Sequence, residues 1–340
     1  MDSKCGRTLF AMTTILLIQI FPLTSAQSIG VNLGLKGNNL PSAKEIVALY
    51  EKYKIRSLRI FEPNHELLEA LRGSTLVVAI GTRDEDVPNI AQDIDAANAW
   101  VQTNVVPYLY NVNIGYINLG NEVTPGPISP YVPNAIKNMI NALTKAGIHK
   151  DIKVSAILKD NVLASSFPPS AGAFSADTAS VIKEIVAILL QHGSPININT
   201  YPYYAYASDP QHISLDYALF KSKSPVVTDG SFQYYNLFDA QLDAYHAAFE
   251  KIGVSNITLT VTETGWPTAG NEPYTTIQNA ADYNKNLIAH VKSGKGTPRR
   301  LGQGLNVFIF ETFNENLKAP GIENNFGVFY PNKDPVYPLF

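Results

Sequence analysis

Residues 259–270 read LTVTETGWPTAG, a β-branched run that ends at a carboxylate and a turn. The run up to Thr262 has the composition of a buried strand. Glu263 follows this run directly, and the triplet Gly-Trp-Pro then breaks the strand pattern. The stretch therefore predicts a strand with an acid at its carboxyl end. The surroundings of that acid depend on the fold, which the other predicted strands indicate.

Runs of similar composition recur along the whole chain, with helical segments between them. The predicted strands are residues 28–32, 57–61, 75–80, 115–119, 153–157, 196–200, 257–262 and 305–310. The predicted helices are residues 42–53, 65–72, 90–105, 133–145, 177–191, 237–251 and 277–291, with Gly147, Gly193 and Gly253 as C-caps.

This alternation predicts an α/β protein with a parallel sheet, because parallel strands need crossover connections and these are usually helices. Eight such units close as a (β/α)8 TIM barrel, here a single domain over residues 27–340. A doubly wound open sheet is the alternative, but no Gly-x-Gly-x-x-Gly turn follows the first strand. No long helix is predicted after Phe310, which is the weakest point of the barrel interpretation.

The first 26 residues have the pattern of a secretory signal peptide that is removed before Gln27. Lys4 and Arg7 precede an apolar run at 9–21, and small residues follow it. The sole cysteine, Cys5, lies within this segment, so no disulfide is expected. We expect a secreted protein of the extracellular space or cell wall, without a further carbohydrate-binding module or a lipid-anchor tail.

Charge and motifs exclude several classes of partner. Without Asp2, Lys4 and Arg7, the 26 basic and 29 acidic residues become 24 and 28, a net charge of −4. With no basic patch and no later apolar run of membrane-spanning length, neither a nucleic acid nor a membrane is an expected partner, and nothing demands more than a monomer. The triplet at Asn256 is a candidate glycosylation site.

The sequence contains no motif typical of a metalloenzyme or of a serine hydrolase. The six histidines are scattered without a His-Glu-x-x-His spacing, so no metal or other cofactor is expected. No Gly-x-Ser-x-Gly elbow occurs either.

Two strands end in carboxylates. INLGNEV at 117–123 places Asn121 and Glu122 at the end of the fourth predicted strand, and Glu263 ends the seventh. In a barrel both would reach the face on which active sites are built. A pair of carboxyl groups in one cleft is what cleavage of a glycosidic bond needs, since one protonates the leaving oxygen and the other attacks or stabilises the sugar carbon. Either glutamate alone would suggest only an ordinary ion pair.

Seven segments together resemble the plant endo-1,3-β-glucanases of glycoside hydrolase family 17. They are GVNLGLKGNNLPS (30–42), NLGNEV (118–123), FPPSAGAF (167–174), NTYPYYAY (199–206), NLFDAQLDA (236–244), TETGWPTAG (262–270) and FETFNENLK (310–318). The resemblance implies a (β/α)8 barrel and retaining hydrolysis of 1,3-β-glucans such as callose or fungal wall glucan, with a role in plant defence. The expected partner is therefore a neutral β-glucan polysaccharide.

The same resemblance assigns roles to individual residues. It implies that Glu122 is the acid/base and Glu263 the nucleophile. It further implies that Glu315, Lys318 and Glu323 tune the charge of the cleft. Candidate substrate-binding residues are Asn121, Tyr201, Phe174, Trp266 and Phe313.

Three departures from the family pattern fall near the predicted site. Leu33 stands where a tyrosine is expected, the loop GTRDED (81–86) replaces a neutral segment, and Glu311 adds a carboxylate. Two alternatives therefore stay open: a hydrolase of mixed 1,3;1,4-β-glucan, and a catalytically weak glucan-binding secreted protein. Retention of both Glu122 and Glu263 argues against the binder.

Overall fold

The computed structural model describes residues 28–148 and 152–340, so the signal segment, Cys5 and His149 lie outside the described residues. One sheet of parallel strands forms its centre, in the order β5-β4-β3-β2-β1-β13-β12-β9-β6. The strands are β1 (Ser28–Leu33), β2 (Ser57–Ile60), β3 (Val77–Gly81), β4 (Asn113–Asn118), β5 (Lys153–Ser155), β6 (Ile157–Lys159), β9 (Ile196–Asn199), β12 (Leu259–Thr264) and β13 (Asn306–Ile309).

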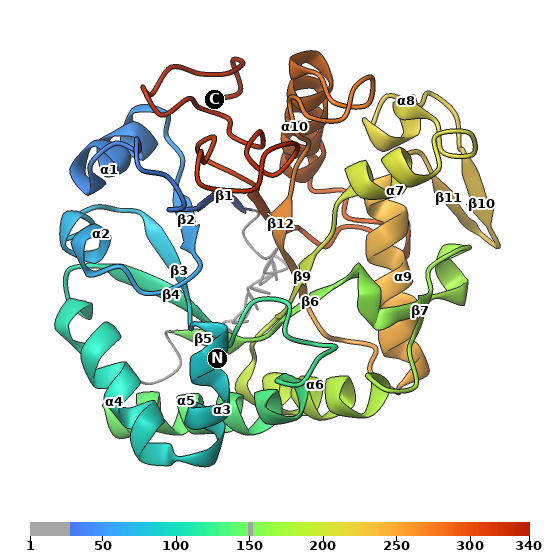
Figure 1. Ribbon diagram of the computed structural model, residues 1–340. Helices are drawn as coiled ribbons and strands as arrows, with labels where there is room; N and C mark the ends of the chain where they lie inside the picture. The colour runs from blue at the N-terminus through green and yellow to red at the C-terminus, as the bar shows by residue number, and fades with distance from the viewer. Residues whose placement is uncertain (1–27, 149–151) are drawn as a thin grey trace, which may run out of the picture.

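The two ends of that strand order are one continuous piece of chain. Only Ala156 separates β5 from β6; β5 pairs with β4 and β6 pairs with β9. The Asn197 amide donates to the Ala156 carbonyl at 3.2 Å, so pairing continues across the break. The sheet therefore closes on itself with eight strand positions, and the predicted (β/α)8 barrel is confirmed (Figure 1).

Helices surround the barrel (Figure 1). They are α1 (Ala43–Lys52), α2 (His65–Ala70), α3 (Val87–Gln92), α4 (Ile94–Asn104), α5 (Val132–Lys145), α6 (Ala179–His192), α9 (Leu237–Lys251) and α10 (Ile277–Ser293). Gly193 caps α6 in the left-handed conformation (φ 66°), as predicted for a glycine C-cap.

The single helix predicted for residues 90–105 is wrong. Asp93 is extended (φ −131°, ψ 115°) and divides this region into α3 and α4. Its carboxylate accepts the Asp95 amide at 2.8 Å and caps α4. An aspartate that bonds to its own backbone neighbours competes with continuous helix, and here that local bond outweighs the apolar periodicity.

Two of the loops after strands contain short elements that were not predicted. They are β7 (Leu163–Ser165), β8 (Ala173–Phe174), α7 (Pro202–Ser208), α8 (Leu215–Ala218), β10 (Val227–Asp229) and β11 (Phe232–Tyr234). The β strands among them form two small antiparallel pairs, which lie near α9 in Figure 1. These elements enlarge one side of the barrel rim.

The segment after β13 contains no helix among the described residues up to Phe340, yet it seals the barrel beside β1. The Thr312 amide donates to the Asn32 carbonyl at 2.8 Å, and the Phe329 amide donates to the Thr312 carbonyl at 2.9 Å. Phe329 also packs on Tyr53 of the first unit, with ring centroids 4.8 Å apart. Backbone pairing and aromatic packing thus replace the missing last helix.

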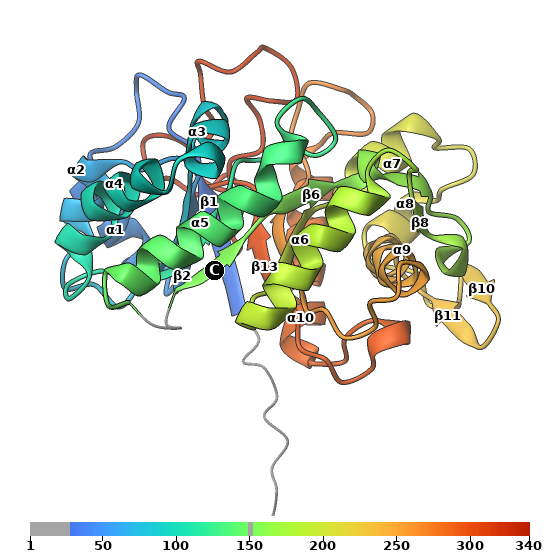
Figure 2. The ribbon, with the colours of Figure 1, turned by 90° about the horizontal axis from the view of Figure 1, so that it is seen from below.

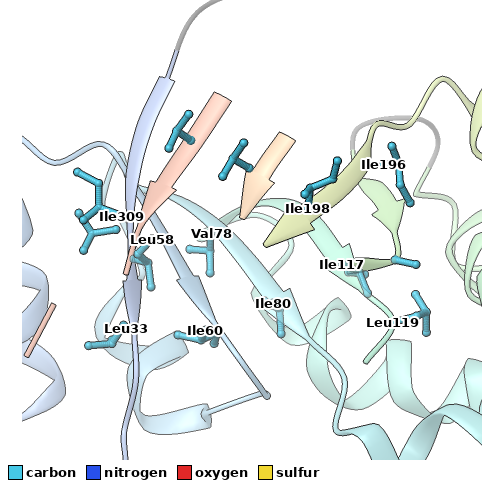
Figure 3. Packing of buried hydrophobic residues seen from close by; sticks show 14 of the residues in the cluster. Leu33, Leu58, Ile60, Val78, Ile80, Ile117, Leu119, Ile196, Ile198 and Ile309 are labelled. Atoms are coloured by element: carbon cyan, nitrogen blue, oxygen red, sulfur yellow. The ribbon is translucent and has the colours of Figure 1, made fainter. Parts of the chain in front are cut away.

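Strand residues alternate between an apolar outer layer and a polar interior, because successive side chains point to opposite faces. Leu58 and Ile60 belong to the continuous buried core shared with the helices, whereas Arg59 between them faces Asn32 inside the barrel. Figure 3 shows the same outer layer on neighbouring strands, including Val78 and Ile80. The interior is therefore free to carry polar groups towards one end.

That end is marked by long loops. In the side view of Figure 2, the loops that follow β1, β12 and β13 rise above the barrel on the same side. Because all strands of the central sheet are parallel, this is the side to which the predicted carboxylates belong. In the described part of the chain, no helix is long and apolar enough to cross a membrane.

Candidate active site

A cleft of about 860 Å³ opens at the carboxyl ends of the strands. Glu122 and Glu263 both line it, as the strand-end pattern predicted. Its lining includes Leu33, Phe61, Asp84, Asn121, Lys159, Asp160, Asn199, Tyr201, Tyr204, Phe310, Glu315, Lys318 and Glu323. Loops that are distant in the sequence therefore supply one shared site.

Glu263 lies at the floor of this cleft and is only 5% exposed. The register of β12 against β9 shifts between Val261 and Glu263, and such a bulge changes the face to which the next side chain points. The Tyr201 hydroxyl donates to Glu263 Oε2 at 2.8 Å, and Arg59 Nη1 lies 2.7 Å from Oε1. Burial raises the pKa of Glu263, while Arg59 and the two hydrogen bonds oppose that rise.

Arg59 holds the polar floor together and was not predicted from the sequence. Its guanidinium is fully buried and donates to Asn32 Oδ1 at 3.0 Å, to Glu263, and to Asn121 Oδ1 at 2.8 Å. The available signal was a charged residue inside the short apolar strand SLRI. A buried charge is retained only where it is paired, so this position indicated a carboxylate partner elsewhere.

Arg59→Met is expected to lower the free energy of unfolding by about 3–5 kcal/mol, because it leaves the buried Glu263 carboxylate without its cation. Chemical denaturation measures this change. Lys137→Met is the matched control, since Lys137 and Glu184 form an exposed pair at 3.0 Å that should contribute less than about 1 kcal/mol. Equal losses in the two variants would contradict the role given to Arg59.

Glu122 occupies a more open position than Glu263. Its backbone is left-handed (φ 58°), and its side chain is 22% exposed against 7% for Glu263. Asn199 Nδ2 donates to Oε1 at 2.8 Å, and Lys159 Nζ lies 3.0 Å from Oε2. The two carboxyl groups thus face one cleft from different environments, one enclosed against Arg59 and one partly open to solvent.

Asp160 adds a further acid next to Glu122 that sequence reasoning also missed. It accepts from the Thr200 hydroxyl at 3.0 Å and from the Tyr245 hydroxyl at 3.2 Å. Part of the residue is exposed, but its carboxyl group is enclosed, and this burial raises its pKa to about 6. The charge of Glu122 acts in the same direction.

Glu311, Glu315 and Lys318 form a second charged cluster in the wall of the cleft. Lys318 Nζ donates to Glu311 Oε1 at 2.7 Å and also pairs with Glu315. The Glu315 carboxylate accepts the Lys36 amide as well. Both carboxyl groups approach Gly34 so closely that a Cβ there would force them to move and would disturb this cluster.

The pKa values of the two carboxyl groups in this cluster shift in opposite directions. Burial raises the pKa of Glu311 well above its usual range, so this carboxyl group keeps its proton. Burial alone would also raise the pKa of Glu315, but the hydrogen bonds from Glu311 and Lys318 outweigh it and lower that pKa. The extra carboxylate noted in the sequence is therefore neutral and donates a hydrogen bond to Glu315.

Glu311→Gln is expected to gain stability relative to the wild type as the pH rises above 4.5, the ordinary value for glutamate. The unfolded chain releases this proton above that pH and the folded protein keeps it, so wild-type stability falls towards the raised pKa. Glutamine does not titrate, and its side chain can still accept from Lys318 and donate to Glu315. Urea unfolding between pH 5 and 7 should show the two proteins diverging by up to about 1.4 kcal/mol per pH unit. Parallel curves would contradict the buried protonated state.

The structure brings together five of the predicted supporting and substrate-binding residues. Asn121, Tyr201, Glu315, Lys318 and Glu323 all line the cleft. Glu323 accepts from the Tyr204 hydroxyl at 3.1 Å. The hydroxyl of Tyr201 donates to Glu263 in this structure, and its contact with substrate stays a prediction.

Phe174, Trp266 and Phe313 do not reach the cleft, so the structure corrects their assignment as substrate-binding residues. Phe174 packs on Phe249 of α9, with ring centroids 4.9 Å apart. Trp266 is fully buried and donates from Nε1 to the Tyr274 carbonyl at 3.0 Å, while Phe313 is 1% exposed. Large aromatic side chains contribute to the core as readily as to sugar binding, and here packing takes all three.

The remaining predictions concern the rim and the outer surface. Leu33 lies on the cleft at the end of β1, and the loop 81–86 forms part of the cleft wall, as expected. Asn256 is exposed before β12, and its glycosylation stays a prediction. Among residues 28–148 and 152–340, no group of three or more histidine, cysteine or acidic residues is arranged to hold a metal ion.

Solved structures with this architecture include plant glucanases. The chain superimposes on CJP38, a beta-1,3-glucanase and allergen of Cryptomeria japonica pollen, with a TM-score of 0.89 and 43% identity over 92% of this chain and 98% of that one. A structure from a study of two plant beta-glucan endohydrolases with distinct substrate specificities gives a TM-score of 0.87 and 39% identity, over 91% of this chain and 99% of that one.

Sequence relatives agree with these structures. A probable glucan endo-1,3-beta-glucosidase of Arabidopsis thaliana is 45% identical over 94% of this chain and 92% of its own. A glucan endo-1,3-beta-glucosidase of Vitis vinifera is 46% identical over 92% of both chains. The profile of the Glycosyl hydrolases family 17 matches residues 29–339. With its closed barrel and its paired glutamates in one cleft, the chain belongs to glycosyl hydrolase family 17.

Proposed function

We propose that this protein is an endo-hydrolase of 1,3-β-glucosidic linkages that retains anomeric configuration, with Glu122 as acid/base and Glu263 as nucleophile. The observation that carries the proposal is the meeting of these two glutamates in one cleft, one buried against Arg59 and one more open. The relatives named as glucan endo-1,3-beta-glucosidases support the same substrate.

In the proposed reaction, the Glu122 carboxyl group gives its proton to the glycosidic oxygen while Glu263 attacks the anomeric carbon from the opposite side. A covalent glycosyl-enzyme forms, and the glucan on the leaving side departs. Glu122 then removes a proton from water, which attacks the same carbon and releases Glu263. Two inversions give overall retention.

The floor of the cleft supplies orientation for these steps. Arg59 donates to both Glu263 and Asn121, so it sets the two side chains relative to one another. With its carbonyl oxygen bound to Arg59, Asn121 keeps its amide N–H groups for a sugar hydroxyl, which is the contact that the family resemblance implies. Tyr201 holds the second oxygen of Glu263.

The site favours an enzyme over a glucan-binding protein. A binding protein has no need of two carboxylates buried or half-buried in one cleft, because each costs desolvation energy. Glu311 does not disturb the pair, since it stays neutral and bonds to Glu315. We further propose that residues 1–26 are removed as a signal peptide and that the mature monomer acts in the extracellular space or cell wall.

The test is reducing-end release by the mature protein from a linear 1,3-β-glucan, a mixed 1,3;1,4-β-glucan and a 1,4-β-glucan, followed by sizing of the products. We expect short oligosaccharides from the first substrate, little from the second and none from the third. Proton NMR during the first minutes should show β-configured reducing ends. Preferential cleavage of the mixed polymer, α-configured ends, or binding without cleavage would each refute the proposal.

A further inference from the structure

We propose that Asp84 is a positioning residue for the acid/base: its carboxylate fixes the loop on which Glu122 stands. This inference rests on the role proposed for Glu122. Asp84 begins the short 3-10 turn Asp84–Asp86 after β3 and lines the cleft. It belongs to the loop 81–86, whose charged sequence departs from the family pattern.

Side chains from that loop bind two consecutive amides of the loop after β4. The Gly120 amide donates to Thr82 Oγ1 at 2.9 Å, and the Asn121 amide donates to Asp84 Oδ1 at 2.7 Å. The next residue is Glu122. Two fixed points therefore lie immediately before the acid/base, and the nearer one is a charge-assisted hydrogen bond, which is stronger than a neutral one.

The backbone of this loop needs such support. Gly120 and Glu122 are both left-handed, with φ of 69° and 58°. A glutamate in this region is strained and stays there only when its surroundings hold it. If the Asn121 amide lost its acceptor, Glu122 would be free to relax to an ordinary conformation and withdraw its carboxyl group from the leaving oxygen.

The neighbours of Asp84 do not give it another structural task. Arg83 forms its ion pairs with Glu85 and Asp86. Within the described residues, the bond to the Asn121 amide is the sole hydrogen bond of the Asp84 side chain. A carboxylate whose one hydrogen bond among the described residues goes to a backbone N–H of the acid/base loop is best explained by the position of that loop.

The consequence is a selective loss of acid catalysis. Protonation of the leaving oxygen is essential for a sugar leaving group and unnecessary for 2,4-dinitrophenolate, which departs unaided. Asp84→Ala should therefore lower kcat/KM on a linear 1,3-β-glucan by roughly 10- to 100-fold, the range for losing a hydrogen bond to a charged group. On the 2,4-dinitrophenyl glycoside of a 1,3-β-gluco-oligosaccharide, kcat/KM should change less than about twofold.

Asp84→Asn is the matched variant, because its side-chain oxygen still accepts the Asn121 amide; it should keep most of the wild-type activity on glucan. Circular dichroism and thermal unfolding establish that each variant is folded. The inference is overturned if Asp84→Ala loses activity equally on both substrates, if it loses none, or if Asp84→Asn falls as far as Asp84→Ala.

Failure of the proposed function looks different. In that case the wild type cleaves neither substrate, or Glu122→Gln shows no dependence on the leaving group. A wild type and Glu122→Gln that behave as proposed, with an Asp84→Ala variant that does not, would remove the inference alone.

Discussion

Replacing Glu263 by glutamine is expected to lower kcat on a linear 1,3-β-glucan by on the order of 10⁴-fold or more, as for other essential nucleophiles. The amide has the shape of the carboxylate but cannot form the glycosyl-enzyme. The glutamine oxygen can still accept from Arg59, which binds one carboxylate oxygen in the wild type, and the Tyr201 hydroxyl, which binds the other, can accept from the amide nitrogen that replaces it. Reducing-end release measures the loss, and equilibrium binding of a 1,3-gluco-oligosaccharide shows that the cleft persists.

A smaller side chain at this position distinguishes the nucleophile from a merely structural acid. Glu263→Ala leaves space on the floor of the cleft, and added azide can attack the anomeric carbon of an activated β-glycosyl fluoride from that side. We expect recovery of activity with an α-configured glycosyl azide as product. Glu69→Gln, which alters an exposed pair on α2, should behave as wild type. A β-configured azide from Glu263→Ala would reverse the assignment of the two glutamates.

The position of Glu263 could be predicted because it depends on local pattern alone. A β-branched run that stops at an acid, repeated at Glu122, needs only the rule that parallel strands end on one face. The same rule placed Leu33 and the loop 81–86 on the cleft. The family resemblance added which glutamate does what, and the closed sheet is in accord with the fold that it implied.

The partners of Glu263 could not be predicted in the same way. Arg59 lies 204 positions away in the sequence, and only the closed barrel brings the two side chains within 2.7 Å. The buried arginine signalled that some carboxylate must meet it, but not which one. The protonated state of Glu311 likewise depends on Glu315, Lys318 and the burial that the C-terminal segment creates.

The aromatic residues show a different limit. Trp266 and Phe174 stand in family motifs and have the flat faces that sugars prefer, yet both are buried in packing contacts. Composition does not separate the two uses, because burying a ring in the core and stacking it on a sugar call for the same side chain. The prediction of one helix over residues 90–105 failed for the opposite reason. There a single local hydrogen bond, from the Asp95 amide to the Asp93 side chain, outweighed the apolar periodicity of the whole segment.

Replacing Glu122 by glutamine should leave the protein folded and slow its reaction in a way that depends on the leaving group. Glutamine keeps an oxygen for the Asn199 amide, and Lys159 is 42% exposed, so water can replace its lost partner. The loss of general acid catalysis should lower kcat/KM on a linear 1,3-β-glucan by about 10²- to 10⁴-fold. On a 2,4-dinitrophenyl glycoside, kcat/KM should stay near the wild-type value, because no proton is needed for departure.

Hydrolysis of the glycosyl-enzyme, the second step of the reaction, tests the acid/base role of Glu122 independently. With the dinitrophenyl substrate, Glu122→Ala should accumulate the glycosyl-enzyme on Glu263, since water attacks slowly without a base. Azide needs no base and enters from the face that Glu122 vacates, so it should raise kcat and yield a β-configured glycosyl azide. Glu184→Gln, on the exposed surface of α6, serves as the control that keeps full activity on both substrates. Equal losses on glucan and on the aryl glycoside, with no azide effect, would show that Glu122 maintains the cleft without transferring a proton.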